Sequence, residues 1–276
     1  MVDLTTAVGA VGLPNPVMCA SGTAGHGAEL GAFVDLAQLG AVVVKSLSAG
    51  PWPGNPAPRV HPLSTGMINS VGLEGPGIAA WAHDELPALR RARARVVVSI
   101  WGRSVEDYAV AADALAKHAP AGTASDPIVA VEINLSCPNL AGKKMFAHDV
   151  GAAADVITAT AGLAYPRWAK LSPNTDALVA VAEACAGAGA DAVTLTNTLL
   201  GLVIDTDSRA FRRLPNDFRG NTVIGTGIDE DVLRAAGIEQ ASAFIAVTNG
   251  DNRNIMAAQV ARSVFEVPEV VCRIYD

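Results

Sequence analysis

The chain has 276 residues, of which 50% are hydrophobic, 17% charged and 5% aromatic, which excludes a disordered chain, a collagen-like fibre and a disulfide-bonded miniprotein. Its length suffices for one large α/β domain or two small domains. The formal net charge is −7 and no Lys/Arg cluster is interleaved with aromatic residues, so we expect no nucleic-acid partner.

The first five residues lack the positive region and the apolar stretch of a signal peptide. No uncharged apolar run of about 18 residues or more follows, so we expect no membrane association. Cys19, Cys137, Cys185 and Cys272 lie far apart without a CxxC pair, which argues for reduced thiols and against a metal site. Together these features predict a cytoplasmic protein.

Short β-branched runs alternate with alanine-rich stretches, which favours parallel strands joined by crossover helices. The predicted strands are 16–21, 41–46, 96–102, 129–136, 167–172, 192–198, 222–227 and 243–249. The predicted helices are 27–39, 78–93, 104–118, 149–162, 174–188, 229–238 and 251–265, with a short one within 205–218. Eight such units are typical of a TIM barrel of about 250 residues, although the alternation alone also fits a doubly wound open sheet.

The charge density changes near residue 205. Residues 1–204 contain 28 Lys, Arg, Asp and Glu residues, whereas the 72 residues of 205–276 contain 19. This change predicts a boundary, with six barrel units in 1–204 and a segment of different origin in 205–276. A more exposed pair of closing helices would explain the same change equally well.

Polar residues gather at the carboxyl ends of five predicted strands, which form the catalytic face of a parallel α/β barrel. They are Ser21, Lys45, Asn134 with Ser136, Lys170, and Asn197 with Thr198. Strands often end in a polar cap, but two lysines within otherwise apolar runs need a partner when they are buried. We therefore expect a functional site at this edge.

Cys137 follows the fourth predicted strand and precedes Pro138. A thiol at such a position is a nucleophile or a general base once its thiolate is stabilised. The alternative is a packed, inert thiol, which is the commoner role of a single free cysteine. No Ser-His-Asp or Cys-His grouping is evident, so a hydrolase triad has little support.

Three glycine-bearing segments fit a phosphate site: 20–25, 225–227 and 249–252. Backbone N–H groups that open a helix bind phosphate, and TIM barrels often do so after strands 7 and 8, where the last two segments fall. Each segment also fits an ordinary tight turn. The sequence contains neither GxGxxG nor GxxxxGK[ST], so no dinucleotide fingerprint or P-loop is complete.

Residues 1 to about 207 resemble the soluble, FMN-containing class of dihydroorotate dehydrogenases. The matching motifs occur in the family's order and are Leu13–Pro16, Ala20–Gly22, Lys45–Ser46, Gly54–Arg59, Gly66–Leu73, Asn134–Asn139, Lys170–Asn174 and Asn197–Gly201. The resemblance covers about three quarters of the chain. It implies a TIM barrel that oxidises dihydroorotate to orotate while FMN is reduced.

The resemblance also implies roles for individual residues. Cys137 is the implied base for the C5 proton, with Lys45 as a second catalytic residue. The implied substrate ligands are Asn69, Val71, Gly72, Leu73, Asn134, Asn139, Asn197 and Thr198. The implied FMN ligands are Ala20, Ser21, Gly22, Lys45, Asn134 and Lys170, to which chain position adds Gly225, Gly227, Asn249 and Gly250. The implied route for the electrons is a partner electron-transfer subunit or a soluble acceptor, and a second copy of the chain in a homodimer is the other implied partner.

Residues 203–276 resemble the C-terminal half of the Rossmann-type, NAD-binding regulatory domain of potassium-uptake (Trk) systems. The motifs are Val203–Asp207, Leu214–Pro215, Gly225–Leu233, Ala246–Asn252 and Arg273–Asp276. The glycine fingerprint of that domain is missing, so we do not expect the tail alone to hold NAD. We expect a chimera in which a Rossmann-like βαβα fragment supplies the last two βα units of a (β/α)8 barrel.

Three functions follow from these resemblances. The first is FMN-dependent oxidation of dihydroorotate by residues 21–198. The second is a non-catalytic chimeric or engineered fold with at most residual flavin or nucleotide phosphate binding, because the replaced quarter would carry part of the FMN phosphate site. The third, a ligand-gated regulatory module for ion transport, is disfavoured by the missing glycine fingerprint.

Overall fold

The computed structural model describes residues 2–57, 59–63, 66–122, 126–136, 145–198, 203–205, 222–246, 251–272 and 274. The chain divides into two compact units. The first comprises residues 1–54 and 72–199, and the second comprises residues 55–71 and 200–276.

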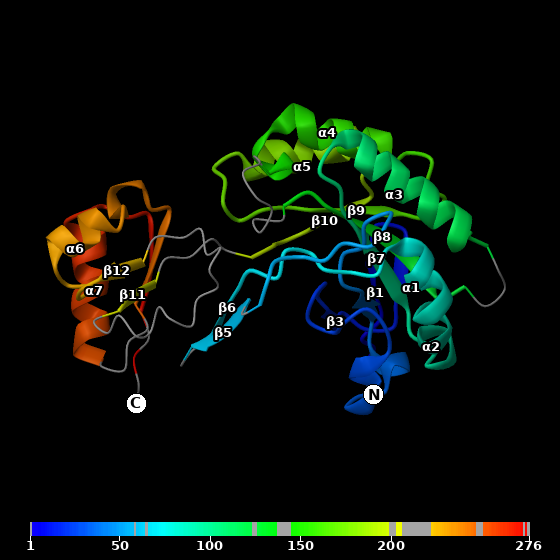
Figure 1. Ribbon diagram of the computed structural model, residues 1–276, viewed down its shortest axis with the longest axis horizontal. Helices are drawn as coiled ribbons and strands as arrows, with labels where there is room; N and C mark the ends of the chain where they lie inside the picture. Colours follow the sequence, from blue (N-terminus) through cyan, green and yellow to red (C-terminus); the bar gives the residue numbers. More distant parts are fainter. Residues whose placement is uncertain are drawn as a thin grey trace. The chain divides into compact units, whose positions relative to one another are not determined.

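A six-stranded parallel sheet forms the centre of the first unit (Figure 1). Its strands are β3 (Met18–Cys19), β4 (Ala41–Val43), β7 (Val96–Ile100), β8 (Ile128–Asn134), β9 (Arg167–Lys170) and β10 (Ala192–Thr194). They lie side by side in chain order, without the reversal of a doubly wound sheet. This order is that of a barrel wall, and the curled sheet forms a half-barrel.

The helices of the first unit are α1 (Ile78–Asp84), α2 (Leu86–Arg91), α3 (Val105–His118), α4 (Val150–Ala159) and α5 (Leu178–Gly187). Figure 1 shows α3, α4 and α5 on the same side of the sheet, and neighbouring helices of this set pack against each other. Ser104 caps α3 by accepting a hydrogen bond from Asp107 N, and Asp149 caps α4 by accepting one from Ala152 N.

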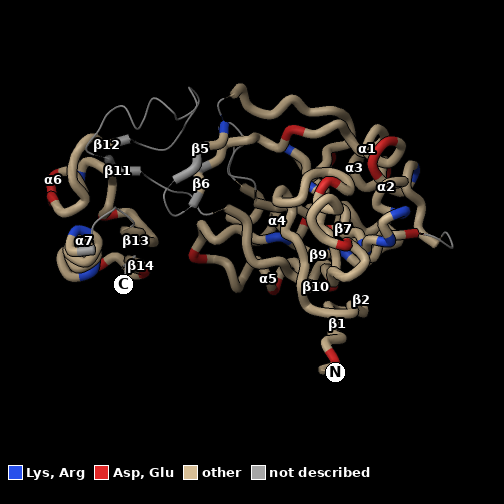
Figure 2. Tube along the Cα trace, turned by 90° about the horizontal axis from the view of Figure 1, so that it is seen from below, with Lys and Arg blue, Asp and Glu red and all other residues tan. Residues whose placement is uncertain are grey.

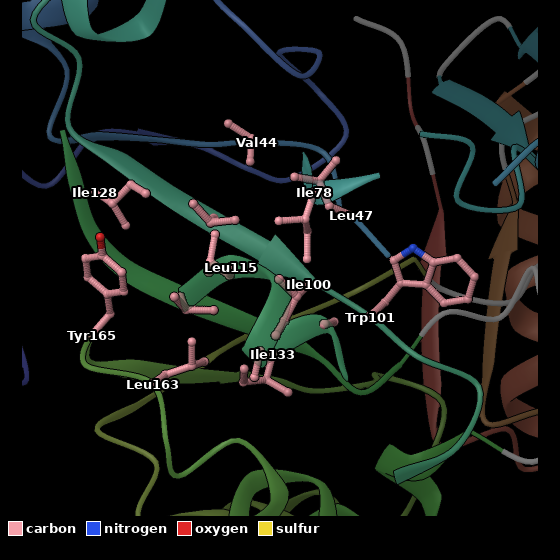
Figure 3. Close-up of a cluster of buried hydrophobic side chains, with 14 of the residues drawn as sticks. Val44, Leu47, Ile78, Ile100, Trp101, Leu115, Ile128, Ile133, Leu163 and Tyr165 are labelled. Carbon is pink, nitrogen blue, oxygen red and sulfur yellow. The ribbon is translucent and has the colours of Figure 1, made fainter. Parts of the chain in front are cut away.

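The core of the first unit has two layers, one on each face of the sheet. Figure 3 shows the layer between sheet and helices, where Val44, Ile100 and Ile133 meet Leu115 and other buried side chains. The opposite, inner face is closed by Val11, Leu13, Ala41, Val43, Val97, Ala130 and Trp168. Because successive strand residues point to opposite faces, Ser99 and Glu132 share the inner face with Val97 and Ala130.

A hairpin supplies the apolar residues that close the inner face. Its strands are β1 (Thr6–Val8) and β2 (Val11–Leu13), paired antiparallel. Gly9 turns the hairpin at a φ of +57°, and a Cβ there would lie 2.8 Å from the backbone oxygen of Asp191. Glycine is therefore required both for the turn and for the close approach to the segment before β10.

Two predicted helices differ from the observed structure. Residues 27–39 form two short 3-10 segments, Glu29–Ala32 and Leu36–Gln38, because a glycine-rich stretch lowers helix stability. The predicted helix 78–93 is divided at Glu85 into α1 and α2, since Pro87 in the first turn of α2 has no N–H to continue α1.

The second unit is described by itself. It contains an antiparallel hairpin of β5 (Val60–Leu63) and β6 (Gly66–Asn69), and two parallel pairs, β11 (Val203–Asp205) with β12 (Thr222–Ile224) and β13 (Ala243–Ala246) with β14 (Glu269–Cys272). Its helices are α6 (Glu230–Ala235) and α7 (Asp251–Ser263). Its small core consists of Leu233, Ile238, Ala261 and Val267.

The two predicted closing strands, 222–227 and 243–249, exist as β12 and β13 but pair differently from expectation. They pair with β11 and β14, neither of which the sequence pattern identified as a strand. Among the described ladders, the six-stranded sheet ends at β3 and β10. Closure of an eight-stranded ring therefore stays a prediction, and the short helix expected within 205–218 lies outside the described residues.

Two further observations concern the surface. Figure 2 shows that Lys and Arg residues alternate with Asp and Glu residues along the described part of the first unit. Of the described helices, none combines the length and the apolar composition that a bilayer crossing requires.

Candidate functional site

A chain of polar contacts runs across the first unit from β3 to the segment after β10. Ser21 Oγ lies 3.3 Å from Ser46 Oγ, which lies 2.8 Å from Ser99 Oγ. Ser99 donates to Glu132 Oε1 at 2.9 Å, and Glu132 meets Lys170 Nζ at 3.5 Å. We call these five residues, with Asn134 and Asn197, the polar network. Its side chains come from β7, β8 and β9 and from the segments that follow β3, β4 and β10.

The Glu132–Lys170 pair is the charged centre of the polar network. The side chains are 1% and 6% exposed, on neighbouring strands β8 and β9. Two buried charges are stable only when they pair with each other and form further hydrogen bonds, because their removal from water costs free energy. Ser99 supplies one of those bonds to Glu132. The ammonium group of Lys170 is therefore held at a fixed point on the inner face.

Asn134 is the branching point of the polar network. Its Nδ2 donates to Ser46 Oγ at 2.9 Å, while its Oδ1 accepts from Asn197 Nδ2 at 2.9 Å and from Ser136 N at 3.2 Å. Tyr108 OH donates to the Asn134 carbonyl at 2.6 Å. These contacts fix which end of the amide donates and which accepts.

Lys45 precedes Ser46 and carries the second ammonium group at this edge. Its side chain is 20% exposed, and Nζ lies 4.0 Å from Glu74. The nearby imidazole of His26 responds to this environment. Burial and the Lys45 charge lower the pKa of His26 below its usual value, whereas Glu29 and Glu74 act in the opposite direction.

Two other predicted segments adopt tight turns in the first unit. After β3, Thr23 N donates to Ala20 O, and Gly22 has a φ of +85°. Gly72 and Leu73 are consecutive residues with φ of +72° and +61°, and Gly72 O accepts a hydrogen bond from Trp52 Nε1 at 2.9 Å. A left-handed leucine is uncommon and marks a backbone shaped by its surroundings.

The segment after β10 is held by an asparagine that the predicted site did not include. Asn174 Nδ2 donates to Thr198 O at 3.0 Å, and Thr198 N donates to Asn197 Oδ1 at 2.8 Å. Asn174 belongs to the motif Lys170–Asn174. Asn174 thus positions Thr198, which in turn contacts Asn197 of the polar network.

Several predicted residues are not brought to this edge within the first unit. Asn69, which pairs with Val60 in the hairpin, and Val71, whose carbonyl accepts from Asn55 N, belong to the second unit. Gly225 and Gly227 also belong to the second unit; a Cβ at Gly225 would meet Val232 at 2.5 Å, so close packing explains that glycine. Cys137, Asn139, Asn249 and Gly250 lie outside the described residues.

Sequence reasoning missed Ser99 and Glu132. Both lie within strands rather than at their ends, in the runs Val96–Ile100 and Ile128–Asn134. The available signal was a polar residue inside a fully buried apolar strand, because such a residue needs a buried partner.

This arrangement can hold a planar heterocycle. Ammonium groups of Lys45 and Lys170 and amides of Asn134 and Asn197 offer donors and acceptors at one end of a parallel sheet. Such a set fits the carbonyl oxygens and ring nitrogens of a flavin. In the described residues, no group of three or more His, Cys, Asp or Glu side chains is placed to hold a metal ion.

Comparisons with known proteins match most of the chain. The family model for dihydroorotate dehydrogenase matches residues 3–245. The catalytic subunit of dihydroorotate dehydrogenase B (NAD(+)) from Alkaliphilus metalliredigens is 42% identical over 210 residues, 75% of this chain and 67% of that protein. The equivalent subunit of Geobacter sp. is 41% identical over 209 residues, which are 75% of this chain and 66% of that protein. The subunit of Alkaliphilus oremlandii is 43% identical over 204 residues, which are 73% of this chain and 65% of that protein. The chain thus spans about two thirds of the relatives that it matches.

Proposed function

Because this chain belongs to the dihydroorotate dehydrogenase family, we propose that it oxidises dihydroorotate to orotate, the redox step of pyrimidine biosynthesis, with FMN as electron acceptor. The polar network carries this proposal, since it gathers Lys170, Asn134 and Asn197 at the carboxyl end of the sheet. In parallel α/β barrels this is the end at which chemistry takes place.

Lys45, Lys170 and Asn134 are the described side chains that we assign to the flavin, beside the turn at Ala20–Gly22. When bound, FMN would supply the acceptor for the hydride that leaves C6 of dihydroorotate. The ammonium groups of Lys45 and Lys170 would stabilise the negative charge of the reduced flavin. Glu132 holds the Lys170 ammonium in place, so little reorganisation is needed. For the phosphate we propose Gly225, Gly227, Asn249 and Gly250.

We assign the substrate ring to amide side chains. Asn134 and Asn197 already bond to each other, and each retains hydrogen-bonding capacity for a ring with both donors and acceptors. Asn69, Asn139 and Thr198 complete the proposed set. The backbone of Val71–Leu73 is assigned to the substrate carboxylate, and the left-handed turn at Gly72 and Leu73 supports this role.

We assign the proton transfer to Cys137. As C6 loses a hydride, the C5–H bond breaks, its electron pair forms the C5=C6 double bond, and the proton passes to the cysteine thiolate. A base that follows strand β8 is close in sequence to Asn134, which helps to place it against the substrate.

The relatives are catalytic subunits of an NAD(+)-linked enzyme, as their names state. We therefore propose that this chain passes its electrons to a separate electron-transfer subunit. A homodimer and a cytoplasmic location complete the proposal.

The family model matches the chain as far as residue 245, which lies beyond the predicted junction at 203–207. The resemblance of residues 203–276 to a potassium-uptake domain gains no support from these matches. We retain one part of that hypothesis as a proposal: residues 205–276 supply the last two βα units of the barrel, with their strands at 222–227 and 243–249.

A dye-coupled assay tests the proposed activity. FMN-loaded chain should reduce an artificial electron acceptor when dihydroorotate is added, and Cys137→Ala should lose turnover while it retains the flavin. Turnover equal to that of the unaltered chain would remove Cys137 from the base role. A chain that takes up no FMN would instead favour the non-catalytic alternative.

A further inference from the structure

The imidazole of His148 contacts a buried serine near the proposed substrate site. His148 Nε2 lies 3.3 Å from Ser172 Oγ, and Ser172, which follows β9, is fully buried. His148 is the last residue of the 3-10 segment Phe146–His148. Ala147 N donates to Leu135 O at 3.0 Å, which fixes this segment to the chain that follows β8. The imidazole is therefore held beside the end of the sheet.

Ser172 Oγ accepts two hydrogen bonds from one residue. Asn174 donates to it from its backbone N at 3.1 Å and from Nδ2 at 3.2 Å. A hydroxyl oxygen has two lone pairs, and these two bonds occupy both of them. The Ser172 hydroxyl therefore has only its hydrogen left to offer, and a buried hydroxyl hydrogen needs an acceptor.

Among the described residues, two acceptors lie within reach of that hydrogen. His148 Nε2 is 3.3 Å from the hydroxyl oxygen, and Met145 Sδ is 3.9 Å from it. A thioether sulfur is a weak acceptor, whereas the bare nitrogen of a neutral imidazole is a strong one. The hydrogen bond accounting thus assigns the Ser172 hydrogen to His148 Nε2, with the ring proton on Nδ1.

Asn174 connects this serine to the proposed substrate ligands. Its other Nδ2 hydrogen is donated to Thr198 O at 3.0 Å, and Thr198 N donates to Asn197 Oδ1 at 2.8 Å. Asn197 Nδ2 in turn donates to Asn134 Oδ1 at 2.9 Å. A continuous series of hydrogen bonds therefore leads from His148 to the polar network.

We propose that His148 is a positioning residue for the substrate ring. It accepts the Ser172 hydrogen and so directs both lone pairs of that oxygen toward Asn174. Asn174 then holds the segment of Asn197 and Thr198 in the orientation that binds dihydroorotate. The inference rests on the proposed function, because Asn197 and Thr198 are substrate ligands only under that assignment.

Two substitutions separate the hydrogen bond of His148 from its packing. His148→Phe keeps a ring but has no acceptor, whereas His148→Gln loses the ring but offers an amide oxygen as acceptor. In FMN-loaded chain, His148→Phe should raise the KM for dihydroorotate about fivefold, which is the effect of one neutral hydrogen bond. Its kcat should stay within about twofold, because the amides hold the ring equally before and during the reaction. His148→Gln should return KM to within about twofold of the unaltered value.

Two further variants test the assignment of the hydrogen. Met145→Leu removes the sulfur at similar volume and should leave KM unchanged. Ser172→Ala should raise KM, and His148→Phe should have no further effect in that background, because both substitutions interrupt the same series. FMN affinity, measured by flavin fluorescence quenching, should be unchanged in His148→Phe, whereas a folding defect would lower it. A higher KM in Met145→Leu together with an unchanged KM in His148→Phe would overturn the proposal.

A spectroscopic measurement without substrate distinguishes this inference from the proposed activity. The side-chain amide signal of Asn174 in a proton–nitrogen correlation spectrum, assigned with Asn174→Asp, should move in His148→Phe and return in His148→Gln. A signal that does not move in His148→Phe, or normal turnover with one KM in both variants, would overturn the inference and leave the proposed function standing. If the signal moves as expected but the unaltered chain does not oxidise dihydroorotate, the proposed function has failed, and the substrate role of His148 fails with it.

Discussion

The ammonium nitrogen of Lys170 lies 3.5 Å from Glu132 Oε1, and both side chains are almost fully removed from water. Each charge is therefore tolerable only while the other is present. The pair joins β8 to β9 on the inner face and fixes one of the two ammonium groups assigned to the flavin. It thus connects the stability of the sheet to the proposed chemistry.

Glu132→Leu should destabilise the first unit by about 3–5 kcal/mol, because it leaves the Lys170 charge buried without a counterion. The double variant Glu132→Leu/Lys170→Met should recover most of that loss. Trp52, Trp81, Trp101 and Trp168 all belong to the first unit, so urea unfolding followed by tryptophan fluorescence reports on it alone.

The control for the Glu132 variants is Glu74→Gln, which disrupts the partly exposed pair that Glu74 forms with Lys45 at 4.0 Å. This substitution should lower the free energy of unfolding by less than about 1 kcal/mol. A Glu132→Leu variant that unfolds at the same urea concentration as the unaltered chain would contradict the account of the buried pair.

Asn134→Asp should weaken FMN binding by at least about tenfold. The substitution keeps the shape but removes the donor to Ser46 and adds a charge beside Glu132. Asn15→Asp is the matched control, since Asn15 lies before β3 and its Nδ2 contacts Gln38 O. Flavin fluorescence quenching measures both affinities, and similar losses in the two variants would argue against a specific role for Asn134.

His26→Phe should make the first unit less sensitive to acid. Burial lowers the pKa of His26 in the folded chain, so the unfolded chain binds the proton more readily. The stability from neutral His26 is complete above its unfolded pKa of about 6.5 and is lost as pH falls towards the lower folded value. Urea midpoints at about pH 7.5 and 5.5 should therefore differ less in His26→Phe, and parallel losses in both proteins would exclude this contribution.

Cys185 should resist alkylation at neutral pH. It is fully buried in α5, and burial raises the pKa of its thiol to about 11. Cys137, the proposed base, should react with iodoacetamide first and should be protected by orotate. Mass spectrometry of the digested protein locates the label. Modification of Cys185 before Cys137 would contradict both expectations.

The structure contains a strand within each of the eight ranges that the sequence pattern predicted. Short β-branched runs bounded by glycine and polar residues are a strong local signal for strands. The pattern also predicted that Lys170, Asn134 and Asn197 lie at one edge of the sheet, because parallel strands end on the same side. It missed Ser99 and Glu132, which form contacts only across neighbouring strands. It also missed β11 and β14, whose pairing with β12 and β13 depends on tertiary structure.

The most direct test of the central claim is a single turnover without oxygen. One equivalent of dihydroorotate added to FMN-loaded chain should abolish the visible flavin absorption and produce one equivalent of orotate. A bound flavin that keeps its colour in excess dihydroorotate would contradict the account.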